Sequence, residues 1–106
     1  MLVITRFQAP SEQADAFAAQ LRAVADAFSV RPGFVDAFAG RNLDDPALWT
    51  LTTRWESVGS YRRALSSYDV KLATAGPYAY ALEEPGAYTD AYADVVAHDP
   101  PSDGNR

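Results

Sequence analysis

The segment from Trp49 to Lys71, WTLTTRWESVGSYRRALSSYDVK, constrains the fold more than any other part of the sequence, because its residue pattern changes once within it. In residues 49–55 the alternate positions are Trp, Leu, Thr and Trp, and a strand places such positions on one face. Ser57 is a typical helix N-cap, since its hydroxyl can accept from the unpaired N–H groups of the next turn. The segment therefore predicts a strand that passes directly into a helix.

Two large aromatic side chains with polar tips flank the predicted corner between this strand and this helix. Trp55 ends the strand, and Tyr61 lies one turn into the helix. At about 100° per residue, Val58, Tyr61 and Leu65 fall within roughly 60° of one another, so we expect them to form the inner face of the helix. Trp55 and Tyr61 are then placed to share the wall of a pocket.

The remaining segments predict strands over residues 2–8, 34–42 and 87–95, and a helix capped by Ser11. Ser67 is predicted to cap a further short helical piece, and residues 77–84 fit either a helix or a strand, with helix favoured. The order is the βαββαβ of an α+β, ferredoxin-like fold with a four-stranded antiparallel sheet. We expect one domain over residues 1–95 and a disordered polar tail over residues 96–106.

Both main helices of such a fold lie on one face of the sheet, which leaves the apolar residues of the other face uncovered. A second copy of the chain is the simplest cover, because symmetric pairs are the commonest assembly. The sequence therefore predicts a homodimer with its sheets packed face to face.

Composition removes several classes of function. The net charge of −5 works against nucleic acid or an anionic membrane as a partner. The absence of cysteine excludes disulfides and thiolate chemistry, and a single histidine with scattered acidic residues makes a metal site improbable. Arg6 interrupts the apolar start of the chain before it reaches signal-peptide length, so we expect a cytoplasmic location.

Residues 2–92 resemble the antibiotic biosynthesis monooxygenase family of dimeric α/β barrels. The resemblance rests on Arg-Pro-Gly-Phe at 31–34, on Gly-Arg-Asn-Leu-Asp-Asp-Pro at 40–46, on Arg-Trp-Glu-Ser at 54–57, and on Tyr61 with Ser-Tyr-Asp-Val-Lys at 67–71. It implies small oxygenases that convert phenolic polyketides to quinones without a cofactor. In that branch, a tryptophan and a tyrosine line the pocket at the positions of Trp55 and Tyr61. An asparagine of that branch corresponds to Leu51 here.

The family that the sequence resembles also has a haem-degrading branch. The axial histidine and the second tryptophan of that branch correspond approximately to Thr74 and Ala64 here, so this sequence has neither residue. Haem degradation is therefore set aside, and no cofactor is expected. An oxygenase without a metal or flavin needs a substrate that is its own reductant, such as an electron-rich phenol. The protein then removes a proton, stabilises the oxyanion and excludes water.

The predicted catalytic residues are Trp55 and Tyr61, whose N–H and O–H can donate to an oxyanion from an apolar wall. The predicted substrate-binding residues are Leu51, Tyr68, Lys71 and Tyr78. Core packing remains an alternative role for Trp55 and for Tyr61. Two other functions also remain open, namely a non-catalytic dimeric ligand-binding module and a proton-transfer isomerase on the same fold.

Overall fold

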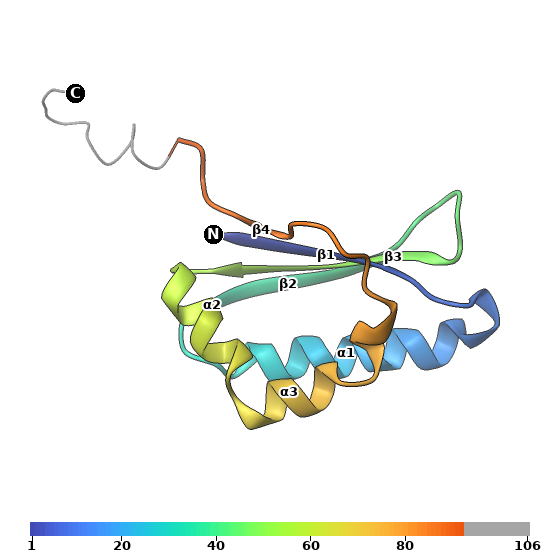
Figure 1. Cartoon of the computed structure of the whole chain (residues 1–106), viewed down its shortest axis with the longest axis horizontal. Coiled ribbons are helices and arrows are strands. Elements are labelled where there is room, and N and C mark those ends of the chain that lie inside the picture. The colour runs from blue at the N-terminus through green and yellow to red at the C-terminus, as the bar shows by residue number, and fades with distance from the viewer. Residues whose placement is uncertain (93–106) are drawn as a thin grey trace, which may run out of the picture.

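The computed structural model describes residues 1–92, and its strands form one antiparallel sheet in the order β2-β3-β1-β4. The elements follow one another as β1 (Leu2–Gln8), the 3-10 helix η1 (Ser11–Gln13), α1 (Ala14–Ser29), β2 (Phe34–Arg41), β3 (Leu48–Trp55), α2 (Val58–Leu65), α3 (Tyr68–Thr74), the 3-10 helix η2 (Pro77–Tyr80) and β4 (Ala87–Tyr88). The three α-helices cover one face of the sheet (Figure 1). The predicted ferredoxin-like α+β fold is confirmed.

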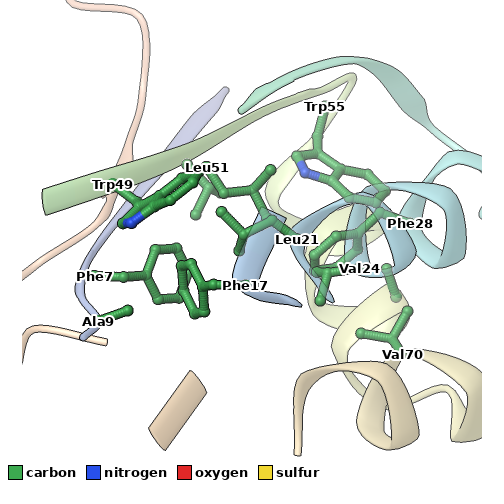
Figure 2. Close-up of a cluster of buried hydrophobic side chains, with 12 residues drawn as sticks. Phe7, Ala9, Phe17, Leu21, Val24, Phe28, Trp49, Leu51, Trp55 and Val70 are labelled. Atoms are coloured by element: carbon green, nitrogen blue, oxygen red, sulfur yellow. The ribbon is translucent and has the colours of Figure 1, made fainter. Parts of the chain in front are cut away.

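The core lies between the sheet and α1, and its members follow the predicted alternation of β3. Trp49, Leu51, Thr53 and Trp55 are each at most 9% exposed. The side chains of Trp49, Leu51 and Trp55 point toward a buried stripe of α1, formed by Phe17, Leu21, Val24 and Phe28 (Figure 2). Burying each of these large apolar side chains contributes about 1.5–3 kcal/mol, so this layer supplies most of the stability.

The inner face of α2 differs from the prediction. Val58 and Leu65 are 40% and 37% exposed, whereas Ser60 and Ala64 are buried. The cause is Gly33, whose φ of 87° requires glycine and which allows Ser60 to pack directly against the backbone. Small residues of α2 therefore face the protein, because the helix lies too close to that turn for larger ones.

Three helix starts were predicted at serines, and two are confirmed. Ser57 accepts from the Ser60 N–H at 3.1 Å, and Ser67 accepts from the Val70 N–H at 3.4 Å. Ser11 makes no such capping bond, because it opens η1 and α1 begins only at Ala14. The predicted N-cap at Ser11 was wrong, although the helix it was meant to start is present.

The last two predicted elements differ in length or type. Residues 77–84 are helical only over Pro77–Tyr80, as a 3-10 helix. The last strand is confined to Ala87–Tyr88, and residues 89–92 do not continue it. Residues 93–95 of that predicted strand and the predicted tail at 96–106 lie outside the described residues. No helix in the described part of the chain is long and apolar enough to cross a membrane.

Candidate functional site

Trp55, the first predicted catalytic residue, is buried at the end of β3 and only 2% exposed. Its indole ring packs edge-on against Phe28 and Phe34, with ring centroids 5.5 and 5.4 Å away. The indole N–H donates to the Thr53 hydroxyl at 2.9 Å, within the buried layer. Trp55 therefore forms an apolar wall, and its polar tip is already bonded to Thr53.

Tyr61 lies beside Trp55, as the corner between strand and helix predicts. The two ring centroids are 5.8 Å apart, and Phe28 stands 6.5 Å from Tyr61 on another side. Burial raises the pKa of the Tyr61 hydroxyl above its ordinary value of 10.0, so at neutral pH the group is a hydrogen-bond donor. Unlike Trp55, Tyr61 is only partly buried and reaches a cavity.

This cavity has a volume of about 250 Å³ and lies along the outer edge of β1. From the helix-covered face it is lined by Tyr61, Val3 and Thr5, and along the edge by the chain between η2 and β4, including Leu82, Glu84 and Gly86. Thr5 is the polar member of the β1 face that carries buried Val3 and Phe7. The cavity therefore combines apolar side chains with two hydroxyl residues, Thr5 and Tyr61, and with the charged residues Arg6 and Glu84.

Tyr78, a predicted substrate-binding residue, belongs to the same region. Its ring packs edge-on against Phe7 with centroids 5.3 Å apart. Burial raises the pKa of Tyr78 to about 12, the proximity of Tyr61 adds to this rise, and the Thr5 side chain opposes it. Thr5, Tyr61 and Tyr78 thus form one cluster of hydroxyl groups between the sheet and the helical layer.

The segment that closes the cavity is attached to β1 at both ends. Leu82 N–H donates to Arg6 O at 2.8 Å, and Ile4 N–H donates to Gly86 O at 2.7 Å. Between these bonds, Glu84 holds the Arg6 guanidinium through two contacts of 2.7 Å. Gly86 permits the close approach, because a Cβ there would lie 2.5 Å from the Ile4 carbonyl oxygen.

The other predicted substrate-binding residues lie elsewhere. Leu51 is 2% exposed within the core, in register with Thr5 on the neighbouring strand. Tyr68, 75% exposed, and Lys71 lie on the outer surface of α3. Their role as substrate contacts stays a prediction. Among residues 1–92, no three histidine, cysteine, aspartate or glutamate side chains gather closely enough to hold a metal ion.

Sequence reasoning passed over Thr5, Arg6 and Gly86 as site residues. Thr5 carried a usable signal, because it is a hydroxyl residue at an alternate position between the apolar residues Val3 and Phe7, with which it shares one face of the strand. Arg6 and Gly86 carried no such signal in the sequence, because their place in the site depends on where the chain after η2 meets β1.

Comparison with known proteins identifies the family. The family model described as antibiotic biosynthesis monooxygenase matches residues 1–75. The chain belongs to this family. A comparison with curated proteins finds no match.

Solved structures share the fold. A Chloroflexus aurantiacus protein that carries the family's name is 28% identical, with a TM-score of 0.65 over 78% of this chain and 84% of that one. SnoaB, a cofactor-independent oxygenase from Streptomyces nogalater, is 22% identical, with a TM-score of 0.68 over 84% and 90% of the two chains. A conserved protein from Methanosarcina mazei is 17% identical, with a TM-score of 0.68 over 81% and 84%. At these identities the last two likenesses concern the fold alone.

Proposed function

We propose that this chain is a cytoplasmic, homodimeric, cofactor-independent monooxygenase that oxidises a phenolic or polyketide-like aromatic substrate with dioxygen. The observation that carries the proposal is Tyr61, an aromatic residue with a hydroxyl group that packs on Trp55 and lines a cavity within the fold of this family. SnoaB, which shares the fold, is a cofactor-independent oxygenase and supports the same type of reaction.

The substrate supplies the electrons in this reaction. A phenol or anthrone loses a proton, and the resulting anion transfers an electron to dioxygen. One oxygen atom becomes the new carbonyl of the quinone, and the other leaves as water. In an anthrone this water takes the two hydrogens of the oxidised CH2 carbon, and in a phenol it takes the one hydrogen of the oxidised carbon and that of the hydroxyl group. The roles left for the protein are to hold the oxyanion by hydrogen bonds and to exclude water. Tyr61 is the proposed donor and offers its ring to the aromatic substrate, and buried Trp55 is proposed to act by packing against that ring and holding it in place.

Oxygen uptake by metal-free, haem-free protein tests this proposal. Offered a panel of anthrones and hydroquinones, the protein should consume oxygen above the uncatalysed rate while quinone absorbance rises. Tyr61→Phe should lower kcat by about 100-fold if its hydroxyl is an oxyanion donor. Tyr92→Phe is the matched control, because Tyr92 is 72% exposed, does not line the cavity and should leave the rate unchanged when its hydroxyl is removed.

The same experiment distinguishes the two other functions. Ligand-induced stabilisation without oxygen uptake would replace the monooxygenase by a binding module. Formation of product under nitrogen would indicate a proton-transfer isomerase. Equal rates for Tyr61→Phe and wild type, with an identified substrate, would remove Tyr61 from the catalytic group.

The proposed homodimer uses the face of the sheet that carries no helix. Val35, Phe38 and Tyr88 are 49%, 62% and 51% exposed, and the register places Phe38 and Tyr88 on that face. Family members are typically dimeric. Sedimentation should give the mass of two chains at micromolar concentration, and Phe38→Asp should shift it toward one. A wild-type mass of one chain would contradict the dimer.

A further inference from the structure

Successive residues of β1 direct their backbone N–H and C=O groups to opposite edges of the strand. In an antiparallel strand, the N–H and C=O of one residue point to the same neighbour, and successive residues alternate. Trp55 N–H donates to Met1 O at 2.9 Å, so the backbone groups of the odd-numbered residues of β1 point toward β3. On the opposite edge of β1, Ile4 N–H donates to Gly86 O and Arg6 O accepts from Leu82 N–H. The Ile4 carbonyl and the Arg6 N–H therefore also point to that side, toward residues 83–85.

These two groups have no partner there. The paired register of β1 with β4 covers only Leu2 and Val3, and the next contacts are the single bonds at Gly86 and Leu82. Within residues 1–92, no backbone or side-chain group bonds the Arg6 N–H or the Ile4 carbonyl. We call this gap, bounded by Ile4, Arg6, Leu82 and Gly86, the ladder opening.

The ladder opening and the candidate site are the same space. The cavity of about 250 Å³ is lined by Ile4, Arg6 and Gly86 as well as by Tyr61 and Thr5. The Arg6 N–H has no protein partner at this edge of the sheet, so it is available to donate to a ligand oxygen that enters the cavity. Glu84 is the one carboxylate of the cavity, and its charge is engaged by the Arg6 guanidinium.

We propose that the ladder opening is the oxyanion pocket of the site, with the Arg6 backbone N–H and the Tyr61 hydroxyl as its two donors. The ligand is a planar phenol that places one deprotonated oxygen at the sheet edge and its rings along the wall formed by Tyr61. A backbone donor fixed by the strand needs no reorganisation when charge develops on that oxygen. This inference rests on the proposed function, because it assigns the group that holds the phenolate.

Amide NMR spectra of the full chain test the proposal with emodin, an anthraquinone that has free phenolic hydroxyls and resembles a product. At saturation, the Arg6 amide proton should move downfield and exchange with solvent about tenfold more slowly. The Ile4 amide, already bonded to Gly86, should shift little. The trimethyl ether of emodin, which has no phenolic hydroxyl to deprotonate, is the matched control ligand and should leave the chemical shift of the Arg6 amide proton unchanged. Tyr61→Phe should weaken emodin binding about tenfold, and Tyr92→Phe, at a tyrosine that is 72% exposed and does not line the cavity, should not.

The outcomes separate this proposal from the monooxygenase proposal. Binding of emodin without a change at Arg6, or no binding at all, would overturn the oxyanion pocket. A shift at Arg6 together with no oxygen uptake from any anthrone would support the pocket and remove the monooxygenase. Oxygen uptake with an unchanged Arg6 amide would support the monooxygenase and overturn the oxyanion pocket.

Discussion

The two edges of β1 have opposite characters. Along one edge, β1 pairs with β3 through seven residues in continuous register, from Leu2 to Gln8. Along the other, it pairs with β4 through only Leu2 and Val3 before the ladder opens. The first edge joins two strands over the hydrophobic core, and the second leaves backbone groups beside a cavity. The continuous edge therefore supplies stability, and the interrupted edge supplies the groups from which a site can be built.

Local sequence accounts for the interruption. Residues 83–85 are Glu-Glu-Pro, and proline has no N–H to donate to a ladder. Gly86 then returns the chain to β1, where the Ile4 carbonyl leaves no room for a side chain. The opening is thus built into the chain and does not require a ligand to form.

The largest effect should come from the continuous edge. Phe7 is fully buried on β1 and packs edge-on against Phe17 and Tyr78, so Phe7→Ala should lower the free energy of unfolding by about 3–5 kcal/mol. Leu43→Ala is the control, because Leu43 is fully exposed in the turn between β2 and β3 and its truncation should cost far less. Urea denaturation measures both, and equal losses would show that Phe7 is not part of the main core.

A second prediction concerns Tyr78, at the boundary between the core and the cavity. Because burial raises its pKa to about 12, the folded state favours the neutral phenol. The contribution of Tyr78 to stability should therefore be constant below pH 10 and fall between pH 10 and pH 12, as the unfolded chain ionises first, by at most about 3 kcal/mol. Tyr78→Phe should flatten this decline, and an unchanged slope would contradict the burial of the hydroxyl.

A third prediction tests the attachment of the interrupted edge. In Gly86→Ala the added methyl group would meet the Ile4 carbonyl, so the segment must move away from β1. We expect a loss of about 1–3 kcal/mol and faster exchange of the Ile4 amide, while the amides bonded to β3 keep their protection. Gly76→Ala, where a Cβ meets only the flexible end of Gln20, is the matched control. A neutral Gly86→Ala would show that the close approach is not required.

The smallest effect should be electrostatic. Hydrogen bonding and charge interaction with Arg6 hold the pKa of Glu84 below its ordinary value of 4.5. The ion pair therefore contributes stability above that pH, and the contribution should disappear as the pH falls through the lower pKa of the folded state. Glu84→Gln should remove this acid dependence and leave stability near pH 7 almost unchanged, because the pair is exposed. A large loss at pH 7 would contradict this view of the pair.

The sequence was sufficient for the parts of the fold that depend on local patterns. The alternation from Trp49 to Trp55 predicts which side chains of β3 are buried, and the capping serines at 57 and 67 mark real helix starts. Trp55 and Tyr61 meet at the corner, as the strand-to-helix transition predicts. These features are encoded within a few residues of one another.

The remaining features depend on contacts between distant segments. Leu65 is exposed because α2 rests on Gly33, which lies far away in the sequence. The Trp55 N–H bonds to Thr53 and leaves Tyr61 as the donor that faces the cavity, which residue spacing does not decide. The ladder opening arises only where the chain after η2 meets β1, so no local pattern of β1 predicts it.

Amide hydrogen exchange along β1 in the ligand-free protein tests the difference between its two edges most directly. The Thr5 and Phe7 amides belong to the continuous edge and should exchange slowly. The Arg6 amide, which lies between them in the sequence but points into the ladder opening, should exchange much faster. Equal protection of Thr5, Arg6 and Phe7 would mean that β1 is paired on both edges and that the opening, and the site built on it, does not exist.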